Sequence, residues 1–582
     1  MALEKVNSPE DLKKLSREEL IVLAQDIRDA MLHRVSNKGG HVGPDFGAVE
    51  LIIALHKVFN SPVDKFVFDV SHQCYPHKII TGRKFGFLDL DRYSEISGYT
   101  NQDESEHDFF KIGHTSTSVS LATGLAKARD LRGVKENIIA IIGDGSLSGG
   151  EAFEGLNVAS ELNTNMIIIA NDNDMSIAEN HGGLYKNLRE LRESNGQSQN
   201  NYFKSLGLDY IYVDKGNDLE ALIEVFEKVK DINHPIVVHV HTQKGKGLPY
   251  AEKDKETWHY GMPFDPETGE KRNSYSGGLS NDTAEFLMDK MEKDSTVAVV
   301  TSGTPTVLGF TRDRREKFAK QFIDVGIAEE QAVAMISGMA KNGGKPIYGV
   351  FSTFIQRTYD QLSQDLAINN NPATILIFGG GLGGMSDVTH LCWFDISLVS
   401  NIPNIVFLAP TSKEEYFAML DWSIEYKGHP VAIRVPSQLS EDTGNVQKDF
   451  SDLNKYLVTE KGKDVAILGL GNFYKLGKEV KELLKENGID ATLINPRYAS
   501  GLDETLLNEL KAEHKLVVTL EDGVIDGGFG EKIARFYGTF DMKVLNYGIK
   551  KEFTDRVAPD VAFKNNRLTK EQIAEDILNI VK

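Results

Sequence analysis

Cysteine is almost absent from this chain, since Cys74 and Cys392 are the only two among 582 residues. A disulfide framework is therefore not expected, and a reducing compartment is favoured. No apolar stretch approaches the roughly 20 residues that a membrane span needs. The charged N-terminus also lacks the apolar core of a signal peptide. These absences predict a cytoplasmic protein with no membrane partner.

Basic residues are fewer than acidic residues. Lys and Arg number 65 against 85 Asp and Glu, so the formal net charge is −20. Such an acidic balance argues against nucleic acids and anionic membrane surfaces as partners. It does not exclude anionic metabolites, because a few local groups suffice to bind a small ligand.

Short β-branched runs alternate with amphipathic stretches along the whole chain. This alternation predicts an α/β protein whose mainly parallel sheets are covered by helices on both faces. A chain of this length exceeds one core, and the polar stretches 251–280 and 437–456 are typical of linkers. We therefore expect three domains, at residues 1–270, 271–440 and 455–582. Expected strands include 66–69, 137–142, 166–170, 235–241, 296–301, 374–378, 404–408, 430–434, 464–468, 491–495 and 515–520, and expected helices include 18–33, 118–131, 218–231 and 474–487.

Two short polar motifs follow neighbouring apolar runs. Gly143-Asp144-Gly145 comes after the run 137–142, and Asp172-Asn173 comes after the run 166–170. Parallel strands would deliver both motifs to the carboxyl edge of one sheet, where open α/β sheets bind ligands. A carboxylate, an amide oxygen and a glycine turn suit a hard divalent cation that also holds a phosphate group.

A second group of candidates lies in the middle of the chain. Glu329 stands at an expected strand-to-helix junction, and the segment 352–361 offers the aromatic ring of Phe354 together with Arg357. Arg357 could bind a phosphate or carboxylate, or could simply pair with an acid. His77 is left open between a structural and a functional role.

Several longer segments carry a family resemblance over nearly the whole chain. They are DVSHQCYPHK (69–78), GHTSTS (113–118), NDNDMSI (171–177), QKGKG (243–247), IAE (327–329) and STFIQRTYDQ (352–361). In this order the chain resembles the 1-deoxy-D-xylulose-5-phosphate synthases, which belong to the transketolase-like thiamine diphosphate enzymes. The resemblance implies a thiamine diphosphate-binding fold with diphosphate-binding, pyrimidine-binding and transketolase C-terminal-like domains.

The resemblance also implies roles for individual residues. Magnesium ligands would be Asp144, Asn173 and the carbonyl of Met175. Glu329 would engage N1′ of the pyrimidine, and burial would help this carboxyl to stay protonated. Cofactor-binding residues would be His72, Gly113, His114, Thr115, Gly143, Asp144, Gly145, Ser146, Asn173, Ile177, Lys244, Glu329 and Phe354. Catalytic residues would be Glu329, His41, His72, His259, His390 and Arg357.

By resemblance, the reaction is the condensation of pyruvate with glyceraldehyde 3-phosphate, an aldose phosphate. Carbon dioxide is lost and 1-deoxy-D-xylulose 5-phosphate is formed, and a homodimer is expected. Two alternatives stay open: a transketolase or related carboligase with a different acceptor, and a non-catalytic regulator on a degenerate thiamine fold.

Two departures from the family concern the acceptor. The family has arginines where this chain has Gly379 and Ser437, and those arginines are expected to hold the acceptor's phosphate. Either backbone N–H groups of the glycine-rich loop 379–384 bind phosphate instead, or the acceptor is not the usual triose phosphate. The sequence does not decide between them.

Overall fold

The computed structural model describes residues 1–272, 278–439 and 446–581. The chain divides into two compact units, called unit 1 (Met1–Ser276 with Gly326–Ala328) and unit 2 (Gly277–Val325 with Glu329–Lys582). Within the described residues, no helix is both long enough and apolar enough to cross a membrane.

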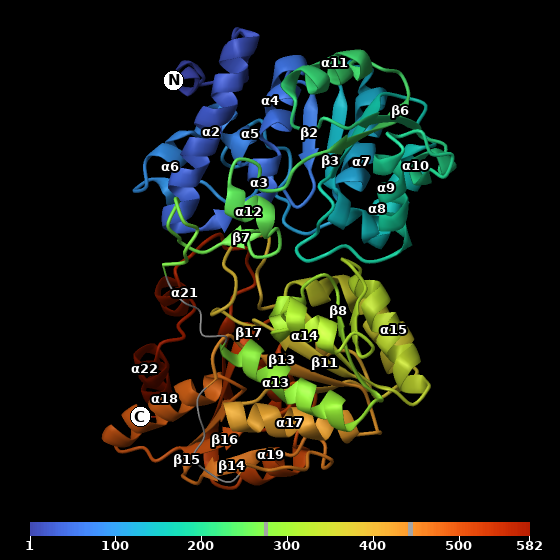
Figure 1. The fold of residues 1–582 in the computed structure, drawn as a ribbon. Coiled ribbons are helices and arrows are strands. Elements are labelled where there is room, and N and C mark those ends of the chain that lie inside the picture. The colour runs from blue at the N-terminus through green and yellow to red at the C-terminus, as the bar shows by residue number, and fades with distance from the viewer. Residues whose placement is uncertain (273–277, 440–445, 582) are drawn as a thin grey trace. The chain divides into compact units, whose positions relative to one another are not determined.

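Unit 1 is built on a five-stranded parallel sheet (Figure 1). Alternate residues of its strand β3 point into two separate cores, as expected for a strand with a period of two. Ile139 and Ile141 belong to the core with helices α4 (Val49–Val58) and α11 (Leu219–Val229). Ala140 and Ile142 belong to the core with α7 (Ser118–Arg132) and α8 (Gly150–Ala159). The sheet is therefore covered on both faces. Its strands, in spatial order, are β2 (Lys65–Phe68), β3 (Ile138–Gly143), β4 (Met166–Asp172), β6 (Pro235–His241) and β5 (Asp209–Val213).

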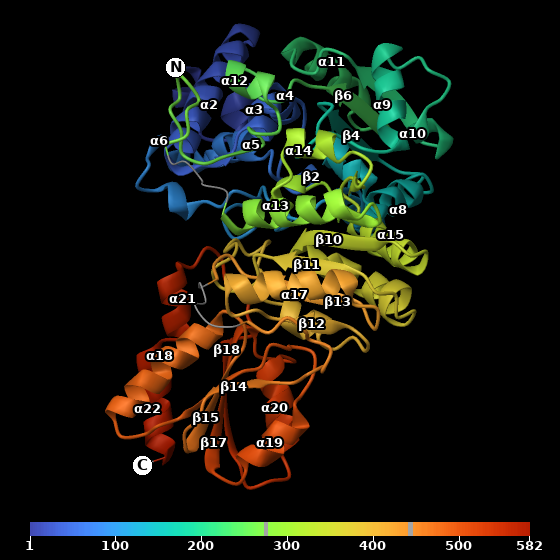
Figure 2. The same ribbon diagram turned by 60° about the horizontal axis from the view of Figure 1, so that its bottom comes forward.

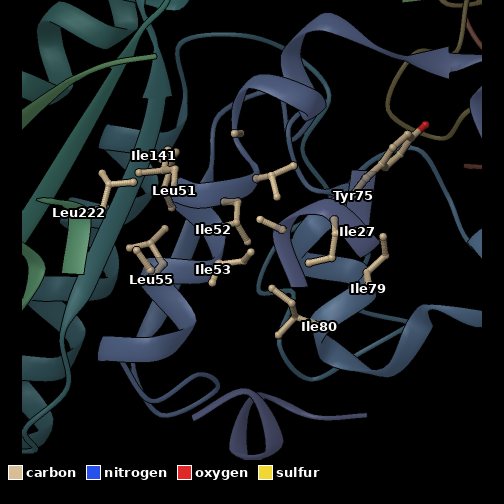
Figure 3. Packing of buried hydrophobic residues seen from close by; sticks show 14 of the residues in the cluster. Ile27, Leu51, Ile52, Ile53, Leu55, Tyr75, Ile79, Ile80, Ile141 and Leu222 are labelled. Atoms are coloured by element: carbon tan, nitrogen blue, oxygen red, sulfur yellow. The ribbon is translucent and has the colours of Figure 1, made fainter. Parts of the chain in front are cut away.

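Helix α4 explains how one face of this sheet is covered. Figure 3 shows Leu51 of α4 beside Ile141 of the sheet, and Leu55 near Leu222 of α11. Each of these side chains is fully or almost fully buried. Helices of unit 1 are α1 (Pro9–Lys13), α2 (Arg17–Lys38), α3 (Gly43–Gly47), α4 (Val49–Val58), α5 (Tyr75–Lys78), α6 (Phe85–Leu88), α7 (Ser118–Arg132), α8 (Gly150–Ala159), α9 (Gly183–Glu193), α10 (Tyr202–Ser205), α11 (Leu219–Val229) and α12 (Pro249–Lys253).

The predicted linker 251–280 is wrong over most of its described part. Strand β7 (Tyr260–Gly261) pairs antiparallel with β1 (Gly40–His41), more than 200 residues earlier in the chain. Trp258 is buried against Tyr250 and Phe264, with ring centroids 4.6 and 4.7 Å away. The stretch is thus packed onto unit 1, and residues 273–277 lie outside the described part.

Unit 2 contains two further sheets (Figure 2). The first is entirely parallel, and the second is parallel except for its edge strand β14, which runs antiparallel to β16. The predicted α/β class with mainly parallel sheets is therefore confirmed, whereas the three-domain division stays a prediction. In spatial order the first sheet has β12 (Val406–Leu408), β13 (Val431–Val435), β11 (Thr374–Phe378), β10 (Lys345–Phe351), β8 (Val297–Thr301) and β9 (Phe322–Asp324), and the second has β14 (Leu457–Glu460), β16 (Thr492–Asn495), β15 (Asp464–Gly469), β17 (His514–Val524) and β18 (Lys543–Ile549).

The second predicted linker, 437–456, also packs where it is described. Phe450 and Tyr456 are buried, and the Tyr498 hydroxyl donates to the Phe450 carbonyl at 2.8 Å. Residues 440–445 lie outside the described part. Helices of unit 2 are α13 (Gly278–Lys293), α14 (Arg312–Lys317), α15 (Glu329–Lys341), α16 (Asp395–Val399), α17 (Lys413–Glu425), α18 (Phe473–Glu486), α19 (Glu504–Leu510), α20 (Phe529–Tyr537), α21 (Pro559–Asn565) and α22 (Lys570–Val581).

Candidate active site

The two polar motifs of unit 1 meet at one edge of its sheet. Strands β3 and β4 are neighbours, and Gly143 pairs with Asn171 at their carboxyl ends. Asp144 therefore emerges beside Asn173, and the Asp144 Oδ2 atom accepts a hydrogen bond from the Met175 N–H at 3.0 Å. The three predicted magnesium ligands lie on two adjoining turns.

Buried oxygens without partners surround these turns. The Oδ1 atom of Asn173 has no hydrogen-bond partner among the described residues, and the same holds for Ser176 Oγ and Asn180 Oδ1. Buried polar atoms in native proteins are nearly always bonded, so such a group calls for an explanation. A hard cation, which prefers carboxylate, amide and carbonyl oxygens, would supply it.

The Asp144 carboxyl is buried close to a second acid, Asp172. It is 2% exposed, and burial together with the charge of Asp172 raises its pKa to about 7. A dication would reverse this balance and favour the ionised carboxylate. The described residues contain no group of three or more His, Cys, Asp or Glu side chains suited to a metal. The predicted ligand set fits magnesium without one, because it combines a carboxylate, an amide and a carbonyl.

Gly145 permits the two turns to approach closely. A Cβ atom at this position would lie 2.8 Å from Ser176 Oγ and 3.1 Å from the Ser176 backbone. Ser146, next in the chain, accepts from the Ser116 hydroxyl at 2.8 Å through its carbonyl. This bond ties the Gly143–Ser146 turn to the segment that carries Gly113, His114 and Thr115.

Asp69 holds that segment in place. Its two carboxylate oxygens accept from the N–H groups of Ser116 at 2.8 Å and Ser118 at 2.9 Å, at the start of α7. The carboxylate thus fixes the loop that contains the predicted diphosphate-binding residues. Asp69 was not among the predicted site residues, although it begins the motif 69–78.

Lys244 connects this edge of the sheet to a histidine cluster. Its ammonium donates to the Ser176 carbonyl at 2.5 Å, beside Ile177, and lies 3.2 Å from His259 Nδ1. Burial lowers the pKa of this lysine to about 7, although the charge of Asp144 opposes the shift. Lys244 therefore stands between the predicted metal ligands and the predicted catalytic histidines.

The three predicted histidines of unit 1 are mutual neighbours. Ring centroids are 5.4 Å apart for His41 and His72, 5.8 Å for His41 and His259, and 5.4 Å for His72 and His259. Burial lowers the pKa of His41 and of His259 well below the usual value, and nearby positive groups act in the same direction. These two rings are neutral near pH 7, so they can accept a proton or donate a hydrogen bond.

The predicted residues of unit 2 form a group of their own. Glu329 is buried at the first position of α15, and burial raises its pKa while Arg357 opposes the rise. Arg357 Nη1 lies 3.5 Å from Glu329 Oε2, so the arginine pairs with an acid, one of the two roles considered for it. The Phe354 ring packs edge-on against His390, with centroids 5.8 Å apart.

The glycine-rich loop 379–384 is largely bonded to the protein itself. Its N–H groups at Gly379, Gly381, Leu382 and Gly384 all donate to internal oxygens. The acceptor for Leu382 is the Asp522 carboxylate, at 2.9 Å. These contacts disfavour the hypothesis that backbone N–H groups of this loop bind phosphate.

Arg434 offers no substitute for the two missing arginines. It is buried, its Nε donates to Asp395 Oδ2 at 2.7 Å, and its Nη2 donates to the Asp522 carbonyl at 2.6 Å. Ser437, at the second departure from the family, is exposed and its hydroxyl donates to the Gly383 carbonyl at 2.9 Å. The loop and the strand end that follows Arg434 are thus neighbours.

Sequence reasoning missed Asn180 as well as Asp69. The Asn180 amide donates to Asp144 Oδ2 at 2.6 Å from a loop seven residues beyond Asn173. No periodicity or motif marks that loop. Only its nearness to the NDNDMSI segment could have drawn attention to it.

Comparison with known families identifies three matching segments. The model for "1-deoxy-D-xylulose-5-phosphate synthase" matches residues 3–202 and 194–242. The models for the transketolase pyrimidine-binding domain and the transketolase C-terminal domain match residues 282–442 and 454–573. Together these matches run through almost the whole chain.

Full-length relatives give the same result. A 1-deoxy-D-xylulose-5-phosphate synthase from Clostridium beijerinckii is 36% identical to this chain, and the alignment covers 99% of each chain. One from Caldanaerobacter subterraneus is 38% identical and covers 100% of this chain and 99% of its own. Among solved structures, a transketolase from Campylobacter jejuni aligns with 97% of this chain and 100% of its own, at 16% identity and a TM-score of 0.45.

Proposed function

Because the chain belongs to the 1-deoxy-D-xylulose-5-phosphate synthase family, we propose that it is a thiamine diphosphate-dependent transferase. It condenses pyruvate with glyceraldehyde 3-phosphate and releases carbon dioxide, giving 1-deoxy-D-xylulose 5-phosphate, a precursor in isoprenoid biosynthesis. The full-length similarity to enzymes of that name carries this proposal.

Unit 1 holds the diphosphate end of the cofactor in this proposal. Asp144, Asn173 and the Met175 carbonyl bind magnesium, and Lys244 neutralises diphosphate charge. The unpartnered Oδ1 atom of Asn173 and the raised pKa of Asp144 support these assignments. When bound, thiamine diphosphate supplies an electron sink for the carbon that loses carbon dioxide, and the protein supplies orientation and proton transfer.

Glu329 is the acid that engages the pyrimidine. Its burial keeps the carboxyl protonated to a higher pH than usual, so that it can donate a hydrogen bond to a ring nitrogen. Phe354 supplies an aromatic face next to His390. Arg357, which pairs with Glu329, limits how far the pKa rises.

The histidines handle protons at the reacting carbon. His41 and His259 are neutral near pH 7, since burial and the neighbouring lysine disfavour their protonated forms. The acceptor's aldehyde oxygen gains a proton when the new carbon–carbon bond forms, and a neutral imidazole at this position can donate a hydrogen bond to that oxygen. The same ring can accept a proton from a hydroxyl group when the product is released. His72 lies within the same cluster and shares this role.

A related carboligase that uses a different acceptor is the second candidate function. Neither Gly379 nor Ser437 can pair with a phosphate, and Arg434 is taken by Asp395. Two lost charge-assisted contacts weaken phosphate binding by about 1.5–3 kcal/mol each. These observations favour an enzyme that also accepts unphosphorylated aldehydes.

The protein works as a cytoplasmic homodimer in this proposal. Both cysteines are buried thiols, which suits a reducing compartment. Phe153 and Val158 on α8, and Leu131 at the end of α7, are exposed apolar side chains. Helices α7 and α8 are neighbours, and in this proposal a second copy of the chain covers these side chains.

One assay tests the activity. Purified protein with thiamine diphosphate and magnesium is given pyruvate and either glyceraldehyde 3-phosphate or glyceraldehyde, and products are identified by mass. Carbon dioxide release coupled to a five-carbon product is expected. A parallel reaction replaces pyruvate with a ketose phosphate, and transfer of a two-carbon unit from it to the aldehyde, without activity on pyruvate, would instead identify a transketolase. Absence of cofactor binding in calorimetry would favour a non-catalytic protein.

A further inference from the structure

Helix α9 (Gly183–Glu193) reaches the turn that carries Asn173. The Arg192 guanidinium donates from Nη1 to Asp172 Oδ2 at 2.5 Å and from Nη2 to Asp174 Oδ1 at 2.6 Å. The two carboxylates belong to the residues immediately before and after Asn173. A single planar fork therefore holds both neighbours of a predicted magnesium ligand.

Asp172 is fixed from further sides. His239 on β6 places its Nε2 atom 2.9 Å from Asp172 Oδ2, and the Asp174 N–H donates to Asp172 Oδ1 at 2.9 Å. Tyr210 on β5 in turn places its hydroxyl 2.8 Å from the other nitrogen of His239. The Asp172 carboxylate thus joins α9 to β6 and, through His239, to β5.

Asp174 adopts a backbone conformation that needs support. Its φ is +60°, in the left-handed region, which a single aspartate adopts where local hydrogen bonds support it. Such conformations persist where the surrounding contacts determine them. The bond from Arg192 is one of these contacts. It holds the turn that leaves the Asn173 Oδ1 atom buried and without a partner.

The same helix also contacts the other turn. The Tyr185 hydroxyl donates to the Gly145 carbonyl at 3.1 Å, and Asn180, just before the helix, donates to Asp144 Oδ2. Tyr185 and Arg192 lie seven residues apart, which is two helical turns and hence one face. One face of α9 therefore bonds to both strand-end turns.

We propose that Arg192 is a positioning residue for the magnesium–diphosphate site, with Tyr185 as a second and weaker anchor on α9. Arg192 sets the direction of the Asn173 side chain by holding Asp172 and Asp174. This inference rests on the proposed function, because it concerns how the same cofactor is held. Outer residues that orient metal ligands typically change metal affinity by about 10–100-fold when removed.

The experiment measures magnesium affinity rather than turnover. Wild type, Arg192→Ala, Arg192→Lys and Tyr185→Phe are titrated with Mg²⁺ by calorimetry at a fixed, saturating concentration of thiamine diphosphate. Arg192→Ala is expected to weaken magnesium binding about 10–100-fold. Arg192→Lys keeps the charge but lacks the fork, so it should recover only part of the loss, and Tyr185→Phe should show the smallest change.

Arg189→Ala is the matched control, because Arg189 is an exposed arginine on the same helix. Its magnesium affinity should equal that of wild type. Thermal midpoints measured without metal separate positioning from plain stabilisation, since a merely structural arginine lowers the midpoint and leaves the affinity unchanged. Should Arg192→Ala fail to fold, Arg192→Lys carries the test.

Wild-type affinity in both Arg192 variants would overturn the inference while leaving the proposed function intact. Failure of the wild-type protein to bind Mg²⁺ and thiamine diphosphate would overturn the proposed function itself. The two failures are therefore distinguishable in one series of titrations.

Discussion

The predicted ligand site of unit 1 and the glycine-rich loop of unit 2 differ in whether their polar atoms have hydrogen-bond partners. Around Asp144, buried oxygens of Asn173, Ser176 and Asn180 lack partners. Around the loop 379–384, backbone N–H groups and the Arg434 guanidinium are bonded to the protein itself. Buried polar atoms without partners are uncommon in native proteins, so three of them beside Asp144 favour a ligand there.

Glu521 makes the same point at a helix start. Its carboxylate accepts from the N–H groups of Phe529 and Gly530, both at 2.8 Å, at the N-terminus of α20. A helix N-terminus is a favourable place for an anion, and here the protein fills it with its own carboxylate. A site with satisfied groups has no need of a ligand, however suggestive its residues are.

Changing a residue that serves the cofactor should lower activity and leave the fold intact, and the largest effect is expected at the acid proposed to engage the pyrimidine. Glu329→Gln should lower turnover by about 10²–10⁴-fold, the range of general acid–base catalysis. Cofactor binding should persist, because the metal ligands lie elsewhere in the sequence. Single-turnover kinetics together with calorimetry measure both quantities, and near-normal turnover would contradict the pyrimidine assignment.

Asp144→Asn tests the other half of the site. The amide keeps the size of the side chain and loses the charge, so magnesium-dependent cofactor affinity should fall by at least the roughly 100-fold that outer-sphere changes reach. Asp214→Asn, which changes an exposed carboxylate just after β5 in the same way, is the control and should leave the affinity close to that of wild type. Equal affinities for Asp144→Asn and wild type would exclude Asp144 as a ligand.

Those parts of the site that follow continuous apolar strands could be predicted from the sequence. The runs 137–142 and 166–170 are strands β3 and β4, so their apolar patterns alone suffice to bring Asp144 and Asn173 to one edge of the sheet. The chain also resembles a family whose motifs name most of the other candidates. Both routes work on local sequence.

Contacts between distant segments could not be predicted in this way. His41 approaches His259 because β1 pairs with β7, a pairing of two-residue strands that leave no periodic signal. The stretch 251–280 has the composition of a linker because Trp258 and Phe264 anchor it singly, without a helical or strand period. Arg192 was missed for the same reason, since its partners lie across a loop.

Ser437→Arg tests whether an added arginine beside the glycine-rich loop 379–384 creates a phosphate-binding site. Ser437 is exposed beside the glycine-rich loop, so a longer side chain has room there. A new charge-assisted contact should raise the ratio of kcat/KM for glyceraldehyde 3-phosphate over glyceraldehyde about 10-fold. Gln438→Arg, one exposed position further along, is the control for added charge alone, and an equal gain in both variants would show that Ser437 does not face the phosphate.

The smallest effect is expected from a buried hydrogen-bonded network within unit 1, and it should concern stability alone. His77 Nε2 lies 2.8 Å from Asp108 Oδ1, its other nitrogen lies 2.9 Å from His56, and Arg83 pairs with the same Asp108. Burial lowers the pKa of His77 to about 4 and that of His56 well below its usual value. Asp108 favours protonation of His77, but the desolvation of the ring outweighs it.

Unfolding exposes the His77 ring and returns its pKa to about 6.5, so at this site the unfolded chain binds more protons than the folded chain between pH 6.5 and pH 4. Stability therefore falls as the pH drops through this window, by about 1.4 kcal/mol per pH unit for His77, and His56 acts in the same direction. Hydrogen exchange of peptides covering residues 49–83 at pH 7.5 and 5.5 measures the loss locally. His77→Gln should remove the contribution of His77 to the dependence of stability on pH. His234→Gln, at an exposed site, should leave this dependence unchanged. A slope that His77→Gln does not alter would mean that the network is not buried as the structure has it.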